Sequence, residues 1–289
     1  MARALSILAV IAAIALAGAG ESRARPAADE RGFDTVSIPL IAEGKPDAAD
    51  SAVTGYLFMP EGAGPFPAVV IMHGCNGLDW LISGRPGWAL AKRYAARYVV
   101  HGYAALILDS FEPRGAGNLC GSPMSVSPQR RAWDAVSAAR WLGGRANIDK
   151  HRLVLQGDSH GGWTVLVALY INRAPVPFAA GIAFYPYCPE GAPGFSAPLL
   201  VLIGGSDDWT PAAHCSAMVA HLARKSGSAV ELKIFPGATH AYDPAAGAHQ
   251  PAWPFHDLRR RRDRGEPAGD RRLPRRACEM IAAVTPGGR

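Results

Sequence analysis

Hydrophobic residues follow two kinds of pattern along this chain. Residues 33–40 and 53–59 alternate apolar and polar positions, which predicts two leading antiparallel strands. Later segments are continuous apolar runs, which is typical of strands in a sheet that is covered on both faces. These runs are residues 66–72, 103–108, 152–156, 178–184, 198–203 and 230–235.

Helical segments lie between the apolar runs. The segment 128–142 illustrates the pattern, because Ser127 precedes it as an N-cap and Pro128 fits its first turn. The predicted helices are residues 88–100, 128–142, a segment around 163–169, and 212–225. Strand–helix alternation of this kind predicts an α/β fold with a doubly wound, mostly parallel sheet and helices on both faces.

One turn in this pattern combines a serine with closely spaced glycines. The sequence Gly-Asp-Ser-His-Gly-Gly at 157–162 separates a predicted strand from a predicted helix, with Ser159 at its apex. A nucleophile elbow requires this spacing, because the serine adopts a strained backbone conformation and only glycine lets strand and helix approach so closely. The pattern therefore predicts that Ser159 is the catalytic nucleophile of an α/β-hydrolase.

A catalytic acid and then a histidine should follow the serine in the chain. Asp207 follows the run 198–203, and His240 follows the run 230–235, so each comes after its own strand. A strand-end aspartate is often only a helix N-cap, as Asp208 would be, and a loop histidine is often only solvated. The order of the residues favours a triad in which His240 accepts the Ser159 proton and Asp207 orients the imidazole.

The loop after residues 66–72 is the predicted second half of the site. In an α/β-hydrolase this loop supplies one N–H of the oxyanion hole, and the residue after the nucleophile supplies the other. We therefore assign the oxyanion donors to the backbone amides of Cys75 and His160. The alternative is that residues 73–77 form only a turn.

These motifs together resemble the dienelactone hydrolase family. The matching residues are His-Gly-Cys-Asn-Gly at 73–77, Asp-Ser-Phe at 109–111, the elbow at 157–162, Gly-Gly-Ser-Asp-Asp-Trp-Thr-Pro at 204–211, and Thr-His at 239–240. In that family the acid stands three residues after the first glycine of the fourth motif, so the resemblance implies Asp207 rather than Asp208. The founding enzymes use a cysteine nucleophile on a cyclic enol-lactone, whereas this chain has Ser159.

The resemblance implies a serine hydrolase that cleaves a small-molecule carboxylic ester or lactone, with no metal and no organic cofactor. Two alternatives remain at this stage. A peptidase of the prolyl-oligopeptidase type shares the elbow, although it usually carries a large additional domain. A non-catalytic exported protein could also use the hydrolase scaffold for binding.

The ends of the chain differ in composition from its middle. Residues 1–20 contain Arg3, an apolar stretch too short to span a bilayer, and a small-residue cleavage site, which together predict a signal peptide. No cysteine follows that stretch, so we expect an exported, periplasmic or secreted protein without a stable membrane anchor. Residues 21–243 would form the catalytic domain.

Residues 244–289 are rich in Arg, Pro, Gly and Ala without helical periodicity until about residue 277. Nine arginines and three acidic residues between 259 and 276 account for the whole net charge of +6. This arginine cluster lacks interleaved aromatic residues, so we expect no nucleic-acid partner. Our hypothesis is that this irregular tail is out-of-frame translation of a GC-rich gene.

Five cysteines become informative in an exported protein, because the compartment is oxidising. Cys75 and Cys120 follow strands that this fold usually places side by side, and Cys188 and Cys215 flank the next pair of loops. We predict disulfides Cys75–Cys120 and Cys188–Cys215, with Cys278 left over. Four cysteines allow three pairings, and buried free thiols are the alternative.

Overall fold

A computed structural model describes residues 32–41, 52–78, 86–171, 178–225 and 229–241. From Phe33 onward these residues belong to one compact unit, and its described strands form an eight-stranded sheet in the order β1-β2-β4-β3-β5-β6-β7-β8. The strands are β1 (Asp34–Pro39), β2 (Ala52–Phe58), β3 (Phe66–Met72), β4 (Ala104–Asp109), β5 (Ile148–Asp158), β6 (Ala180–Phe184), β7 (Leu199–Gly204) and β8 (Val230–Phe235).

The sheet is antiparallel only at its leading edge. β1 pairs with β2, and β2 with β4, in antiparallel fashion, whereas the pairs from β4 through β3 and β5 to β8 are parallel. This confirms the predicted α/β class and the mostly parallel sheet. β5 begins four residues earlier than predicted, at Ile148, because the polar residues 149–151 interrupt the apolar signal between Ile148 and the continuous run.

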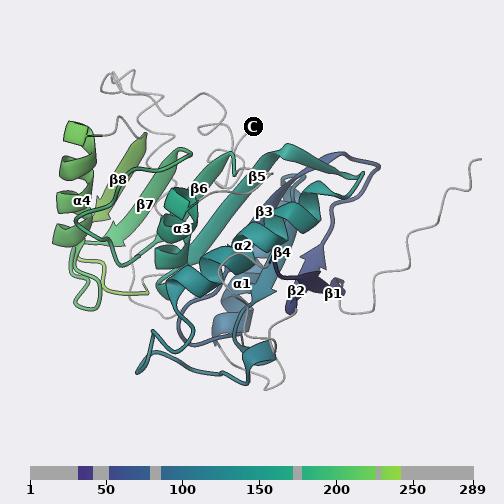
Figure 1. The fold of residues 1–289 in the computed structure, drawn as a ribbon, viewed down its shortest axis with the longest axis horizontal. Coiled ribbons are helices and arrows are strands. Elements are labelled where there is room, and N and C mark those ends of the chain that lie inside the picture. Colours follow the sequence, from purple (N-terminus) through teal and green to yellow (C-terminus); the bar gives the residue numbers. More distant parts are fainter. Residues whose placement is uncertain (1–31, 42–51, 79–85, 172–177, 226–228, 242–289) are drawn as a thin grey trace, which may run out of the picture. The chain divides into compact units, whose positions relative to one another are not determined.

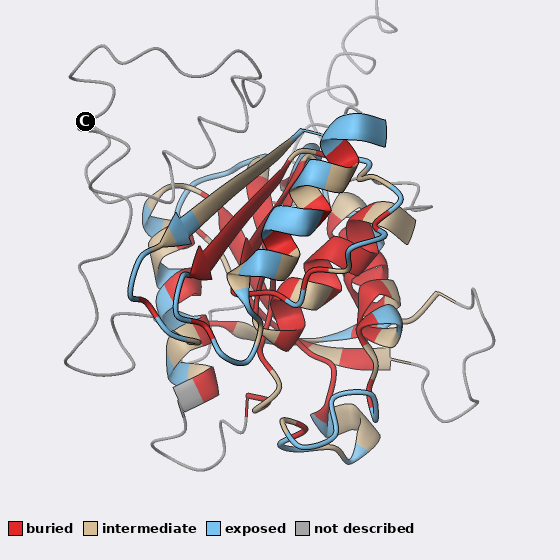
Figure 2. Ribbon diagram, turned by 90° about the vertical axis from the view of Figure 1, so that its left-hand side faces the viewer, coloured by how far each residue is buried: buried red, intermediate tan, exposed pale blue. Residues whose placement is uncertain are grey.

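The four α-helices among the described residues cover both faces of the sheet (Figure 1). They are α1 (Pro86–Val100), α2 (Pro128–Gly143), α3 (His160–Ile171) and α4 (Ala212–Lys225), and a short 3-10 helix spans Glu112–Arg114. α1 lies on one face, and α2, α3 and α4 lie on the other (Figure 1). The central strands between these helices are buried (Figure 2). The Ser127 side chain caps α2 as predicted, since its Oγ accepts from the Arg130 amide at 3.2 Å.

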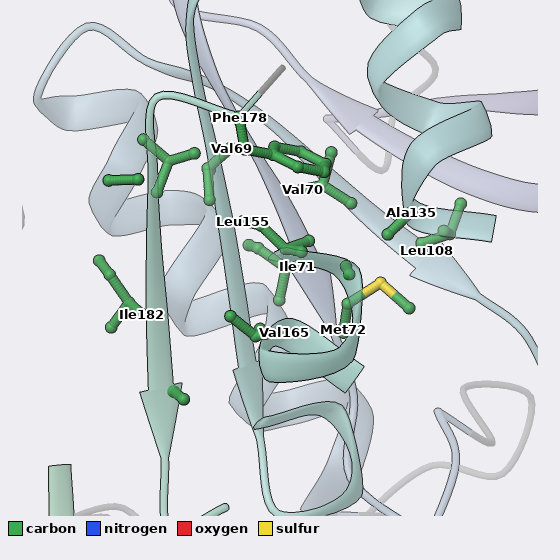
Figure 3. Packing of buried hydrophobic residues seen from close by; sticks show 14 of the residues in the cluster. Val69, Val70, Ile71, Met72, Leu108, Ala135, Leu155, Val165, Phe178 and Ile182 are labelled. Carbon is green, nitrogen blue, oxygen red and sulfur yellow. The ribbon is translucent and has the colours of Figure 1, made fainter. Parts of the chain in front are cut away.

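The core lies between the central strands and the helices. Val69, Val70, Ile71 and Met72 of β3 are all buried, as are their neighbours on β4 and β5. Side chains from these strands pack against Val165 of α3 and Ala135 of α2 (Figure 3). Burial on both faces explains why the central strands read as continuous apolar runs.

The parallel register places several strand ends at one edge of the sheet. β3 ends before Cys75, β5 before Ser159, β7 before Asp207 and β8 before His240. Loops at the carboxyl ends of parallel strands are where α/β folds place their sites.

Some predictions concern residues outside the described ranges. The predicted signal peptide (residues 1–20), the tail (residues 244–289) and Cys278 all lie there. Within the described ranges, every helix is too short or too polar to cross a membrane.

Candidate active site

The turn between β5 and α3 has the backbone of a nucleophile elbow. Ser159 has a φ of 52°, in the left-handed region that side-chain-bearing residues rarely adopt. A Cβ on Gly157 would collide with the Gly161 carbonyl, and a Cβ on Gly161 would collide with the Met72 carbonyl. The Ser159 amide donates to the Phe184 carbonyl at 2.9 Å, which ties the strained turn to the end of β6.

The three residues that the sequence assigned to a triad lie within hydrogen-bond distance of one another. Ser159 Oγ is 3.0 Å from His240 Nε2. On the other side of the ring, His240 Nδ1 is 2.9 Å from Asp207 Oδ2 and 3.1 Å from Oδ1. Because an ionised carboxylate only accepts, Nδ1–H donates to Asp207 and Nε2 is left to accept from the serine hydroxyl.

Asp207 is held in place by groups that follow it in the chain. Its Oδ1 accepts from the backbone amides of Trp209 at 3.0 Å and Thr210 at 2.8 Å, and its Oδ2 accepts from the Thr210 hydroxyl at 3.0 Å. The neighbouring Asp208 is exposed to solvent. The structure therefore brings Asp207, rather than Asp208, to His240.

Two aromatic rings flank the imidazole. Trp209 stacks on His240 with a centroid separation of 5.2 Å and an interplanar angle of 18°. Tyr185, which has a positive φ of 36°, meets the same ring edge-on at 4.9 Å. The sequence did not single out Tyr185 or Thr210, since their roles depend on how the loops after β6 and β7 come together.

The amides predicted as oxyanion donors are on neighbouring segments. His160 is the first residue of α3, so its N–H has no partner within the helix. Cys75 follows β3, and its carbonyl accepts from the Leu119 amide at 2.7 Å. β3 and β5 are adjacent parallel strands, so both residues lie at the same edge of the sheet.

Both predicted disulfides are present in the structure. Cys75 is bonded to Cys120, which joins the loops after β3 and β4, two adjacent strands. Cys188 is bonded to Cys215, which joins the loop after β6 to α4. Each disulfide therefore fixes a segment that leads into the candidate site.

A buried polar cluster lies behind the elbow and was not anticipated from the sequence. Arg131 Nη1 is 2.7 Å from His160 Nδ1, and Arg131 Nη2 donates to the His73 carbonyl at 2.7 Å. His160 Nε2 lies 2.7 Å from the Pro123 carbonyl. A signal was available, since Arg131 falls on the inward face of α2 with Ala135 and Ala138, where an arginine is unexpected.

Burial controls the protonation of this cluster. Desolvation, with the positive charge of Arg131 as a second cause, lowers the pKa of His160 to about 4. Desolvation also lowers the pKa of His73 well below its ordinary value. It lowers the pKa of Arg131 to about 10, so the guanidinium stays charged at neutral pH.

The described residues contain no group of three or more His, Cys, Asp or Glu side chains arranged to hold a metal ion. The groups that the structure brings together at the site are a hydroxyl, an imidazole and a carboxylate in line, beside the amino end of a helix.

Comparisons with known proteins agree with this architecture. Residues 53–252 match the dienelactone hydrolase family. An uncharacterized protein of Mycobacterium tuberculosis is 32% identical over 208 residues, which cover 64% of this chain and 67% of the relative. A probable 2-oxo-3-(5-oxofuran-2-ylidene)propanoate lactonase of Bradyrhizobium is 25% identical over 206 residues, 65% of this chain and 77% of the relative.

Among solved structures, a putative dienelactone hydrolase from Klebsiella pneumoniae superimposes with a TM-score of 0.60 at 19% identity. The match covers 80% of this chain and 96% of the Klebsiella chain, and at that identity it shows the fold alone. The sheet order, the elbow and these similarities define an α/β-hydrolase. Within that class, the chain belongs to the dienelactone hydrolase family.

Proposed function

We propose that the protein is an exported serine hydrolase that cleaves a carboxylic ester or lactone through an acyl-enzyme. The observation that carries the proposal is the line of hydrogen bonds from Ser159 Oγ through His240 to Asp207, at 3.0 and 2.9 Å. Family membership supports hydrolase chemistry in general. The assignment of the reaction to these three residues is our own.

In the first step, Ser159 Oγ attacks the carbonyl carbon of the substrate while His240 Nε2 takes the hydroxyl proton. The resulting imidazolium keeps its Nδ1–H on Asp207, whose negative charge stabilises it. The Asp207 carboxylate is held against the imidazole, because the Trp209 and Thr210 amides and the Thr210 hydroxyl all donate to it.

The tetrahedral intermediate carries its negative charge on the former carbonyl oxygen. The amides of Cys75 and His160 donate to that oxygen, and the amino end of α3 adds a favourable dipole. When the intermediate collapses, His240 returns its proton to the leaving alkoxide and the acyl group remains on Ser159. Water, activated by His240, then releases the carboxylic acid by the same steps in reverse.

An ester or a lactone suits this site, since either carries a carbonyl and an alkoxide leaving group. A lactone keeps its leaving hydroxyl attached to the acyl group, so its hydrolysis gives one hydroxy acid. The Bradyrhizobium relative is described as a probable lactonase, which favours including lactones among the substrates to be tested.

Export is supported by two observations of different kinds. The described part of the chain contains two disulfides, which persist in oxidising compartments. The first 20 residues have the composition of a signal peptide. We therefore place the enzyme in the periplasm or outside the cell.

A hydrolysis assay tests the proposed reaction. Wild-type protein and Ser159→Ala are assayed on p-nitrophenyl esters of graded acyl length and on small lactones, with circular dichroism to verify folding. We expect ester or lactone hydrolysis that falls by several orders of magnitude in Ser159→Ala, because triad members act as a unit. Equal activity in the two proteins would refute the assignment of Ser159.

A further inference from the structure

Arg131 is fully buried and contacts both segments that carry the proposed oxyanion donors. Its exposed fraction is 0%, although burial of a charged group is costly. Nη1 contacts the side chain of His160, and Nη2 donates to the carbonyl of His73, two residues before Cys75. The nearby carboxylates of Asp134, Asp158 and Asp109 favour the charged form of Arg131, so a guanidinium donates at this place.

The side chain of His160 extends the connection to a third segment. A carbonyl can only accept, so Nε2 carries the proton and donates to the Pro123 carbonyl at 2.7 Å. Nδ1 is then unprotonated and accepts from the Arg131 guanidinium at 2.7 Å. The imidazole is therefore neutral, in one tautomer, and joins α2 to the loop that contains Cys120.

Together with the Cys75–Cys120 disulfide, these hydrogen bonds form a closed path. Starting at Cys75, the path runs through the disulfide to Cys120, along the chain to Pro123, across His160 and Arg131 to His73, and back along the chain to Cys75. We call this closed path the support ring. It contains both residues whose amides are the proposed oxyanion donors.

We propose that Arg131 and the His160 side chain are positioning residues that fix the Cys75 and His160 amides relative to each other by closing the support ring. This inference rests on the proposed function, since it assigns a purpose to the oxyanion donors of that reaction. Neither side chain has to touch the substrate in order to act in this way.

The two donor amides lie on separate segments, the loop after β3 and the first turn of α3, so catalysis requires that their relative position be fixed. Oxyanion donors act only when they lie within about 2.7–3.1 Å of the developing charge. A displacement of about 1 Å in a reacting group can cost on the order of a hundredfold in rate. Loss of one link loosens the loop after β3 relative to the first turn of α3, although beside the disulfide the Leu119 amide still donates to the Cys75 carbonyl.

The test compares two ways of opening the support ring. His160→Leu removes both imidazole hydrogen bonds, and Cys75→Ser with Cys120→Ser removes the disulfide while keeping both backbone amides. We expect each change to lower kcat for a p-nitrophenyl ester by about tenfold to a hundredfold, with KM nearly unchanged. The affinity for a trifluoromethyl ketone, which mimics the tetrahedral intermediate, should fall in the same proportion.

The combined variant provides the decisive comparison. Without the disulfide, the ring is closed beside Cys120 only by the weaker hydrogen bond from the Leu119 amide to the Cys75 carbonyl. His160→Leu should therefore add less than its full effect to the loss in the Cys75→Ser, Cys120→Ser protein. The matched control combines His160→Leu with Cys188→Ser and Cys215→Ser, which removes the disulfide outside the ring. There the two losses should multiply.

Titration of Ser159 with a fluorophosphonate gives the fraction of folded, reactive protein in each variant and corrects kcat for it. If wild-type protein does not react, the proposed function itself fails. If wild-type protein reacts but the ring variants keep their kcat and ketone affinity per reactive site, only the support ring is refuted. Losses that multiply within the ring as they do in the control would also refute it.

Discussion

The indole of Trp209 lies nearly parallel to the imidazole of His240, at 5.2 Å between centroids and an angle of 18°. Trp209 is 63% exposed, so this ring covers the histidine from the solvent side without being part of the core. Its backbone amide meanwhile donates to Asp207. The residue is thus in contact with two members of the proposed triad.

Replacing the indole should weaken catalysis moderately. An aromatic face stabilises a neighbouring cation by about 0.5–2 kcal/mol, and His240 becomes a cation during the reaction. We therefore expect Trp209→Leu to lower kcat/KM by roughly threefold to thirtyfold, and Trp209→Phe to retain most of the activity. Steady-state kinetics on a p-nitrophenyl ester measures this, and equal losses in both variants would exclude an aromatic contribution.

The two adjacent aspartates should differ sharply. Asp207→Asn leaves the imidazole without a negative partner and allows the amide to favour the wrong tautomer, so we expect a loss of several orders of magnitude in kcat. Asp208→Asn changes an exposed carboxylate and should have a mild effect. Parallel kinetics of the two variants measures the contrast, and the reverse order would show that the acid has been misassigned.

Acidification should destabilise the fold partly through His160. Its pKa is about 4 in the folded protein, against an ordinary value of 6.5. Between these two pH values the unfolded chain binds a proton that the folded protein does not, so stability falls as the pH falls from 6.5 to 4. The loss from this single group amounts to about 3 kcal/mol.

Urea unfolding of wild-type protein and His160→Asn at several pH values between 7 and 4 measures this contribution. Asparagine does not titrate, so the free energy of unfolding of the variant should decline less steeply than that of the wild type. Parallel curves for the two proteins would show that His160 is not held neutral in the fold.

Reduction should lower activity before it unfolds the sheet. The Cys188–Cys215 and Cys75–Cys120 disulfides hold loops around the site, whereas the core of β3, β4 and β5 contains no disulfide among its described residues. Treatment with dithiothreitol should therefore reduce ester hydrolysis while circular dichroism stays constant, with thiols counted by alkylation and mass spectrometry. Full activity with both disulfides reduced would show that the disulfides do not position the loops for catalysis.

Much of the fold follows from the chain's own patterns. β3, β8 and α4 begin and end where the hydrophobic pattern places them, because a proline or glycine lies within three residues of each end. The positions of Ser159, Asp207 and His240 also follow, since each stands in the turn or loop after a strand and strand order in a parallel sheet brings these strand ends together.

Other parts of the site depend on contacts that no local pattern records. The support ring joins residues from α2, from α3, and from the loops after β3 and β4, and a sequence does not show which carbonyl a buried arginine will reach. Tyr185 has an ordinary aromatic sequence context, and only the packing of the loop after β6 against His240 gives it a role.

The most direct test of the account is whether Ser159 reacts as an activated nucleophile. Folded protein is treated with a fluorophosphonate, the intact mass is measured, and the adduct is located by peptide mapping. We predict one adduct per chain, on Ser159, which is absent in Ser159→Ala and strongly slowed in His240→Ala. Folded wild-type protein that remains unlabelled, or carries its adduct on another residue, would contradict the central claim.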